Sequence, residues 1–451
     1  MNRRSFIKHS TILTGGLVLS NSLAASFHIS KKTSVIIIGA GFAGLAAAYA
    51  LSKKKIPFVI LEARNRIGGR VFSFEADPAE KLVIELGAEW VGKSHERLMD
   101  LCKEFNLELQ NNQFDTHLLY KGKYSPQGQW DYSEPWKKKW DSMLKTYRHL
   151  TEVDKRKLDK YDWWRYLVNN GCEASDLEIK ELLDSTDFGE SIRHVSAFAA
   201  LAEYAESSKK NEMDYKIKGG NGKLAEALAD KVGREFIKTG YKVVTINQTD
   251  KVKVVCANGE TFTADKLICT APTFAAKKIN WQPALPANVM QAMNELQYAR
   301  INKHPVLFNQ RFWKDESFDM ITDTPAHYIY HATKNQPSQK GVLISYTIGD
   351  KAAMISNQSE EWNGRNVLEA LSPGFGDVKS LVEKQFNYYW GQDEFSMGAY
   401  ALYGVGQWFD VRPILRKSFL HTHFAGEHLA DWQGFMQGAI DTGEEAAGKI
   451  S

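Results

Sequence analysis

The sequence is poor in cysteine and has no long hydrophobic run, and each absence removes a class of protein. It has four cysteines among 451 residues, and no two of them have the CxxC spacing of a zinc or redox site. The histidines add no metal-ligand spacing, so we expect no metal. The four cysteines are scattered: Cys102, Cys172, Cys256 and Cys269. Whether Cys256 and Cys269 form a disulfide or lie buried as free thiols stays open.

The chain also lacks a transmembrane segment and a strong net charge. After residue 30 no stretch approaches the roughly 18 uninterrupted apolar residues of a membrane-spanning helix. Lysine and arginine (57) exceed aspartate and glutamate (54) by three. Those three positive charges all lie in residues 1–25, which contain no acid, so the rest of the chain is near neutral. We therefore expect no nucleic-acid partner.

The first 25 residues have the layout of an export signal. A basic "MNRRSFIKHS" precedes a moderately apolar "TILTGGLVLS" and small residues up to Ala25. The Arg3–Arg4 pair resembles a twin-arginine signal, whose route moves folded proteins. It predicts a periplasmic or secreted protein, with cleavage near Ala24 or Ala25. The alternative is a basic N-terminus with no targeting role.

A glycine-rich segment then has the pattern of a dinucleotide-binding loop. "SVIII", from Ser34, is an uncharged β-branched run, typical of a strand buried on both faces. G-x-G-x-x-G and a predicted helix, "LAAAYALSKK", follow. Gly39 permits the tight turn, Gly41 lets a pyrophosphate approach, and Gly44 lets the helix pack closely. The helix N-terminus offers unpaired N–H groups to phosphate. A second strand, "PFVILEA", ends at Glu62, where an acid is expected to bind the ribose hydroxyls.

A second pair of glycines follows this acid directly. "ARNRIGGRVF" contains Gly68 and Gly69 between Arg64 and Arg70. Adjacent glycines beside arginines indicate a further backbone approach to phosphate, with charge to neutralise it. The order of strand, loop, helix, strand and acid predicts a bound dinucleotide, but it does not distinguish a nicotinamide from a flavin.

Four segments resemble the flavin-dependent amine oxidase family, which includes monoamine, polyamine and L-amino-acid oxidases. They are "VIIIGAGFAGLAAA", "LEARNRIGGR", "ELGAEWVG" at 85–92 and "FAGEHLADWQGFMQGAIDTGEEAA" at 424–447. The last segment is the most specific, because in the family it returns to the flavin and opens a helix beneath it. The resemblance covers most of the chain after residue 33 and implies FAD as the cofactor.

The resemblance also implies an α/β fold with a discontinuous Rossmann-type FAD-binding domain and a mixed α+β substrate-binding domain. We expect the FAD-binding domain at 31–100, 205–275 and 398–451. The substrate-binding domain is expected at 101–204 and 276–397. Residues 240–272 are predicted to form strands with a turn at Asn258 to Glu260, and residues from about 150 to 208 are predicted to be helical.

Cofactor contacts are carried over from the family onto matching positions. Val243 is expected to touch the adenine through its backbone, and Gly426 and Glu427 to lie near the pyrophosphate and ribityl chain. The residues near the isoalloxazine are Gly434, Phe435 and Met436. The full set of expected FAD contacts is Gly39, Ala40, Gly41, Ala43, Gly44, Glu62, Ala63, Arg64, Gly69, Arg70, Ala88, Glu89, Trp90, Val243, Gly426, Glu427, Gly434, Phe435 and Met436.

Three residues are implied to be catalytic. Lys303, in "YARINKHPVLF", matches the family lysine that reaches the flavin N5 through a water and helps dioxygen react. A strand there would point it inward. Tyr400 and Phe435 match two aromatic residues that flank the amine, although core packing alone is the competing interpretation. Ala399 replaces the cysteine that bonds to flavin in monoamine oxidases, so we expect non-covalent FAD.

Three functions remain open. The first is an oxidase that converts an amine to an imine, and then to an aldehyde and ammonia, while dioxygen becomes hydrogen peroxide. The second is an L-amino-acid oxidase or a tryptophan 2-monooxygenase-like enzyme, and the third is a flavoprotein without turnover that binds or transfers electrons. Glu89 and Trp90 stand where amino-acid oxidases usually carry an arginine, which favours amines. The sequence leaves open whether the chain forms a homodimer.

Overall fold

The uncharged run that begins at Val35 forms the central strand of a five-stranded parallel sheet. The computed structural model describes residues 34–206, 213–431 and 433–450 and orders this sheet β23-β13-β1-β2-β9. Its strands are β1 (Val35–Ile38), β2 (Phe58–Glu62), β9 (Ile237–Thr239), β13 (Lys266–Cys269) and β23 (Thr422–Phe424). The sheet therefore joins segments from the beginning, middle and end of the described chain.

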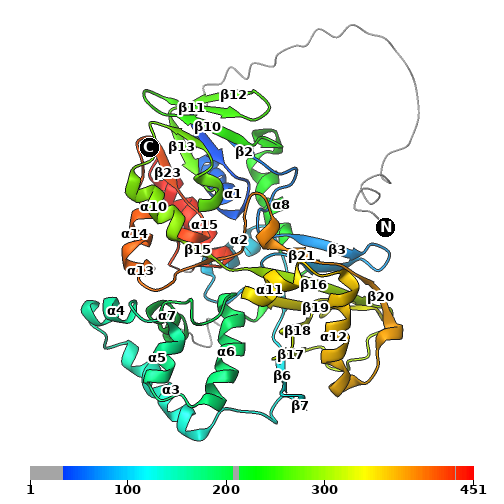
Figure 1. Ribbon diagram of the computed structural model, residues 1–451. Helices are drawn as coiled ribbons and strands as arrows, with labels where there is room; N and C mark the ends of the chain where they lie inside the picture. Colours follow the sequence, from blue (N-terminus) through cyan, green and yellow to red (C-terminus); the bar gives the residue numbers. More distant parts are fainter. Residues whose placement is uncertain (1–33, 207–212, 432, 451) are drawn as a thin grey trace, which may run out of the picture. The chain divides into compact units, whose positions relative to one another are not determined.

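Both faces of this sheet are covered, which explains why β1 carries no charge. Val35 and Ile37 pack against one set of helices, and Ile36 and Ile38 pack against a second sheet on the other face. The helices are α1 (Phe42–Lys53), α2 (Glu96–Glu104), α8 (Gly222–Val232) and α15 (Met436–Gly448). The second sheet, in the order β12-β11-β10-β14, contains β10 (Val243–Asn247), β11 (Val252–Cys256), β12 (Thr261–Ala264) and β14 (Asn280–Gln282). Figure 1 shows these layers around α1 and α15.

Two glycines allow the helices to approach this closely. A side-chain carbon at Gly44 would lie 1.9 Å from the backbone oxygen of Gly39, so α1 packs tightly on its own loop. A carbon at Gly443 would lie 2.1 Å from the backbone oxygen of Ala43, so α15 lies directly against α1. The predicted packing role of Gly44 is confirmed.

A larger mixed sheet forms the other half of the fold. Its path is β20-β16-β19-β18-β17-β6-β7, with β21 also paired to β16. The strands are β6 (Asp115–Tyr120), β7 (Lys123–Ser125), β16 (Ile301–Phe308), β17 (Phe318–Thr322), β18 (Tyr328–His331), β19 (Gly341–Ile348), β20 (Val382–Gln385) and β21 (Tyr388–Tyr389). The β17–β6 pair is parallel, and its other pairs are antiparallel.

Helices pack against this sheet and continue beyond it (Figure 1). They are α3 (Glu134–Tyr147), α4 (Glu152–Leu158), α5 (Trp163–Asn169), α6 (Ala174–Phe188), α7 (Ala197–Glu206), α11 (Gly349–Ile355) and α12 (Glu360–Phe375). Short ribbons and helices connect the two halves: β3 (Ser73–Asp77), β4 (Leu82–Glu85), β5 (Leu109–Asn111), β8 (Tyr215–Ile217), β15 (Gln297–Tyr298), β22 (Ala401–Leu402), α9 (Thr273–Ala276), α10 (Ala287–Glu295), α13 (Gln407–Asp410) and α14 (Arg412–Leu415).

The predicted fold class, a Rossmann-type sheet with a mixed second part, is confirmed, while the exact domain boundaries stay a prediction.

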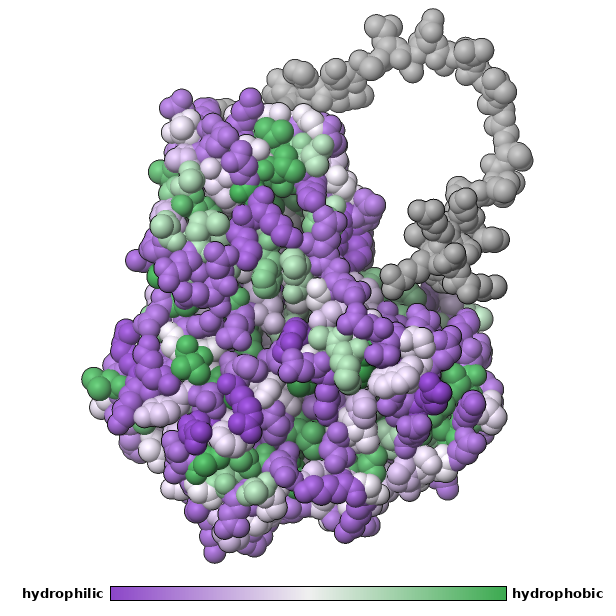
Figure 2. Space-filling view, in the orientation of Figure 1, coloured by the Kyte–Doolittle hydropathy of each residue, from purple (hydrophilic) through white to green (hydrophobic). Residues whose placement is uncertain are grey.

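All four cysteines are buried as free thiols, so Cys256 and Cys269 do not form a disulfide. No helix in the described part of the chain has the length and hydrophobicity to span a membrane. On the face drawn in Figure 2, hydrophilic residues predominate and hydrophobic ones form small separate groups. The predicted export signal at residues 1–25 lies outside the described residues.

Candidate active site

A cavity of about 950 Å³ lies between the parallel sheet and the large mixed sheet. One end is formed by the glycine loop after β1 and by the "IGGR" turn, and the other by β16 to β19 and helices α6 and α7. The volume is at the upper end of the range for small-molecule and cofactor sites. The structure places every expected cofactor and catalytic residue on its wall except Ala40 and Gly44.

Glu62 organises the dinucleotide end of the cavity. It is the last residue of β2, and its carboxylate accepts hydrogen bonds from the backbone N–H groups of Ala40 (2.7 Å) and Arg64 (2.8 Å). Ala40 therefore does not line the cavity itself, but its backbone N–H holds the Glu62 carboxylate in position. Because Glu62 ties the end of β2 to the glycine loop, its position is set before any ligand arrives.

The two glycine turns and two helix N-termini give this end an affinity for anions. Gly41 and Gly68 face each other in a parallel backbone bridge, and Gly69 lies next to Gly41. Helices α1 and α15 both begin at the cavity, with no side-chain cap and no acid in the first turn. Uncapped N–H groups and the positive end of each helix dipole favour phosphate and other anionic groups.

One carboxylate, Glu427, links the cofactor end to the aromatic residues. Arg70 donates to one oxygen of Glu427, which also accepts from the backbone N–H of Ala401 (3.2 Å), while the other oxygen accepts from Gly434 (2.8 Å). Burial disfavours the charged carboxyl, but Arg70 and these donors outweigh it, so the pKa of Glu427 is lowered. A single buried anion thus fixes the segments that carry Tyr400 and Phe435.

Tyr400 and Phe435 come together at the cavity wall. A side chain at Gly434 would collide with the Tyr400 ring, 2.7 Å from Cδ2, so this ring lies against the residue before Phe435. The Tyr400 hydroxyl donates to the backbone oxygen of Asp187, and Phe435 contacts the ring of His95 at 5.2 Å. The arrangement agrees with two rings beside one binding position.

Lys303 is buried at the same cavity. It lies on β16 on the same face as Ile301 and Leu307, and it is only 2% exposed. Its Nζ donates to the backbone oxygens of Glu85 and Gly87, each at 2.9 Å. The predicted inward direction on a strand is confirmed. Burial lowers the pKa of the Lys303 ammonium, and Glu89 acts in the opposite direction.

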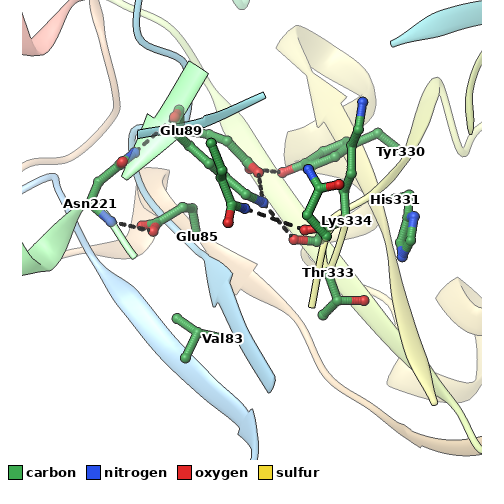
Figure 3. A network of polar contacts seen from close by, with 12 residues as sticks. Val83, Glu85, Glu89, Asn221, Tyr330, His331, Thr333 and Lys334 are labelled. Atoms are coloured by element: carbon green, nitrogen blue, oxygen red, sulfur yellow. Dashed lines mark hydrogen bonds and ion pairs between the residues drawn. The ribbon is translucent and has the colours of Figure 1, made fainter. Parts of the chain in front are cut away.

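Glu89 is the centre of a buried polar network around this lysine. Its carboxylate lies 3.5 Å from Lys303 Nζ and 3.4 Å from Lys216 Nζ, and it accepts from the Tyr330 hydroxyl at 2.6 Å. Figure 3 shows Glu89 with Tyr330 on one side and Asn221 on the other. Asn221 donates to the backbone oxygen of Glu89 (2.8 Å) and to the carboxyl of Glu85 (2.7 Å). This network holds the lysine in place without a cofactor.

Four carboxyl groups at or next to the cavity have raised pKa values: Glu85 and Asp319 are buried, whereas Glu203 is half-buried and Asp187 is exposed to the cavity. The pKa is about 7 for Glu85, Asp187 and Asp319, and about 8 for Glu203. Neighbouring acids add to the shift, Glu89 for Glu85 and Asp184 for Asp187. Perturbed titration inside a cavity is typical of a functional site. Sequence reasoning missed Asp187, Glu203 and Asp319, because an acid on a predicted helix or strand gives no sign that a cavity lies beside it.

Residues 42–451 match the model of the family described as "Flavin containing amine oxidoreductase". The chain belongs to this family. Amine oxidase [flavin-containing] B of Homo sapiens is 26% identical over 94% of this chain and 86% of that protein. L-amino-acid oxidase of Crotalus adamanteus is 27% identical over 96% of this chain and 89% of that protein. A structure of putrescine oxidase bound to putrescine superposes with a TM-score of 0.84, at 22% identity over 93% and 99% of the two chains.

FAD is the cofactor of this flavin-containing amine oxidoreductase, and the cavity fits it. Glu62, the facing glycine turns and the two uncapped helices would hold its dinucleotide part. Among the described residues that line the cavity there is no cysteine or histidine, and Ala399 precedes Tyr400. With no thiol or imidazole among these lining residues, we expect FAD to be held without a covalent bond. The described residues contain no group of His, Cys, Asp and Glu side chains that could hold a metal ion.

Proposed function

We propose that this enzyme oxidises an amine without a carboxylate and uses dioxygen as the electron acceptor. One amine, one dioxygen and one water would give one aldehyde, one ammonia and one hydrogen peroxide. When bound, FAD accepts a hydride equivalent from the carbon that bears nitrogen and passes two electrons to dioxygen.

The distribution of charge in the cavity carries this proposal. Among the described residues that line it, the arginines are Arg64 and Arg70, and both are already engaged by acids, Asp393 and Glu427. No arginine from the described residues remains to form the bidentate pair that an amino-acid carboxylate prefers. The second candidate, an L-amino-acid oxidase, is favoured by similarity to the Crotalus enzyme, but the described residues that line this cavity include no free arginine for the substrate carboxylate.

Each of the main cavity side chains has a separate role in the proposed reaction. Tyr400 and Phe435 would present ring faces to the amine, exclude water and orient the carbon that is oxidised. The amine must lose its ammonium proton before oxidation, and an enclosed aromatic site favours the neutral form. Lys303 would keep a positive charge at the wall where dioxygen gains negative charge. Glu427 holds the two aromatic segments in register and is a positioning residue.

A comparison of tryptamine with tryptophan tests the proposal. Under anaerobic conditions the amine should bleach the yellow flavin, and in air it should release peroxide and ammonia in equal amounts. Faster reduction by tryptophan would establish the amino-acid oxidase instead. If a broad panel of amines and amino acids leaves the flavin oxidised, the chain is a flavoprotein without this turnover.

We propose separately that residues 1–25 export the folded protein by the twin-arginine route to the periplasm or medium. The support is the sequence "NRRSFIK" with small residues up to Ala25. Replacing Arg3 and Arg4 together with lysine keeps the charge and removes the motif. Fractionation should then find the enzyme retained in the cytoplasm, and normal export of the double variant would refute this route.

A further inference from the structure

Glu89 joins two buried lysines, one at the cavity wall and one behind it. One carboxylate oxygen of Glu89 lies 3.4 Å from Lys216 Nζ, and the other lies 3.5 Å from Lys303 Nζ. Lys303 lines the cavity, whereas Lys216 does not. The Glu89 side chain has no exposed surface, so these charges interact with little screening by water or salt.

The surrounding structure holds this carboxylate in place. The oxygen that faces Lys303 also accepts from the Tyr330 hydroxyl at 2.6 Å, and the Glu89 backbone oxygen accepts from the Asn221 amide at 2.8 Å (Figure 3). Lys216 is fixed independently, because its Nζ donates to the backbone oxygen of Ala332 at 2.8 Å. Contacts from three separate segments of the chain therefore fix Glu89 between the lysines.

Glu89 is the carboxylate that pairs with Lys303. Among the described residues, no other acid lies within ion-pair distance of Lys303 Nζ. Its two hydrogen bonds go to the uncharged backbone oxygens of Glu85 and Gly87. The Glu85 carboxyl also acts on the lysine, but it accepts hydrogen bonds of its own, and burial raises its pKa to about 7.

Tyrosines face Lys303 from the neighbouring strands and carry no charge. Tyr330 and Tyr346 have ring centroids 5.7 and 5.8 Å from Nζ, Tyr328 stacks on Tyr330, and Tyr388 is the register partner of the lysine on β21. Burial raises the pKa of each phenol, so all four are neutral near pH 7. The lysine's charge therefore depends mainly on Glu89 and Lys216.

This charge matters at the step that reduces dioxygen. Dioxygen takes two electrons and one proton from the reduced cofactor and one proton from water, and it leaves as hydrogen peroxide. Its first electron makes it an anion, which an ammonium at the wall stabilises and a neutral amine does not. Burial lowers the pKa of Lys303, Glu89 raises it, and Lys216 lowers it again.

We propose that Glu89 is a positioning residue for the oxygen step, which holds Lys303 as an ammonium at the cavity wall, and that Lys216 limits this effect by sharing the carboxylate. The proposal rests on the amine oxidase function above and deepens it, because it assigns the charge of the lysine to a second residue. Removal of Glu89 and removal of Lys216 should therefore have opposite effects, which a purely structural role does not produce.

The test follows the pH at which reoxidation slows. The FAD-loaded enzyme is reduced anaerobically with one equivalent of dithionite and mixed with dioxygen at each pH, so no amine is needed. In Glu89→Gln the rate should fall at a pH lower by at least about one unit than in the wild-type enzyme, a tenfold loss of proton affinity. In Lys216→Met the fall should move to higher pH.

The midpoint potential of the bound flavin gives a second measurement that does not depend on turnover. A nearby positive charge stabilises the reduced, anionic flavin, so the potential should fall more steeply with pH where Lys303 loses its proton. That pH should shift down in Glu89→Gln and up in Lys216→Met. Glu108→Gln is the matched control, since Glu108 is an exposed acid paired with Lys218. It should leave both pH profiles unchanged.

Glu89→Gln leaves two buried lysines without a carboxylate, which costs stability. If this variant does not fold, the double variant with Lys216→Met leaves only one, and comparison with Lys216→Met alone gives the same test. An unmoved pH step, a shift of both single variants in one direction, or a wild-type rate that does not fall with pH would overturn the proposal. The amine oxidase function would still stand. Conversely, opposite shifts in an enzyme that no amine reduces would support Glu89 while the proposed function fails.

Discussion

Replacing Lys303 with methionine should separate the two halves of the catalytic cycle. The substitution keeps most of the side-chain volume and removes the charge from a position that is only 2% exposed. Lys303 lies among the rings of Trp90, Tyr330 and Tyr346, with Nζ 5.7–5.8 Å from each centroid. Methionine fits such a neighbourhood, so the cavity shape should persist.

The expected effect on oxygen chemistry is large. A unit charge about 5 Å from developing negative charge, at an effective dielectric constant of about 20, contributes about 3 kcal/mol. That is roughly 10²-fold in rate and agrees with the loss of one preorganised electrostatic contact. Reduction of the flavin by amine under anaerobic conditions should change only a few-fold, because the negative charge gained in that step is spread over the flavin ring, whereas in reoxidation it is concentrated on dioxygen.

The same substitution also has a cost in stability. It breaks an ion pair with Glu89 and leaves two backbone oxygens, of Glu85 and Gly87, without their donor. Breaking a buried pair costs about 3–5 kcal/mol. Lys216→Met is the matched control, because Lys216 lies 3.4 Å from the same Glu89 carboxylate but does not line the cavity. It should lose comparable stability and keep fast reoxidation.

Stopped-flow absorbance can follow the two half-reactions separately. In the wild-type enzyme, reoxidation should slow as pH rises through the lowered pKa of Lys303, and Lys303→Met should show no such step. Unchanged reoxidation in Lys303→Met would show that dioxygen is activated elsewhere. An equal slowing of both half-reactions would show that the lysine only shapes the pocket.

Three further outcomes follow from the structure. Acid precipitation should leave free FAD in the supernatant, because Ala399 offers no thiol; flavin bound to the pellet would contradict this. Gly44→Ala should destabilise the protein or abolish FAD binding, since the new carbon would lie 1.9 Å from the Gly39 oxygen, whereas Gly448→Ala, which meets open space, should be tolerated. Without amine, the free energy of unfolding should fall from about pH 7.5 to 8.5. The raised carboxyls hold protons in the folded state that the unfolded state has already lost, and histidines are largely neutral in both states there. Denaturant titrations should show a smaller fall in Glu203→Gln; an unchanged fall would mean that Glu203 does not titrate in this range.

The parts of the site that are local in sequence could be predicted from it. The glycine loop, Glu62 and the second glycine pair lie within one strand-helix-strand unit, so spacing alone fixes their relation. The strands at 240–272 are confirmed as β10 to β13, because β-branched runs and an asparagine-glycine turn are strong local signals. Lys303 was assigned from the family resemblance, and the apolar residues around it supported only its inward direction.

The relations between distant segments could not be predicted. Glu89 was noted for the arginine it replaces, but its contacts with Lys216 and Lys303 exist only once β8 and β16 lie against the segment after β4. Asp187 and Glu203 sit on helices rich in acids, where a solvated face is the ordinary interpretation. Only the packing of α6 and α7 places these two carboxyl groups at the cavity wall, without an ion pair to a described side chain.

Electrostatics also explains why the cavity can take its two ligands in only one arrangement. At one end, uncapped helix N-termini and Arg70 provide positive potential, and the acids there, Glu62 and Glu427, are already hydrogen-bonded. At the other end, Asp187 and Glu203 line the wall without an ion pair to any described side chain, and a cation there would favour their ionised forms. A pyrophosphate is repelled from the second end, and an ammonium finds no open partner at the first. The sign of the charge thus orients both molecules so that they meet at Tyr400 and Phe435, where the wall carries rings.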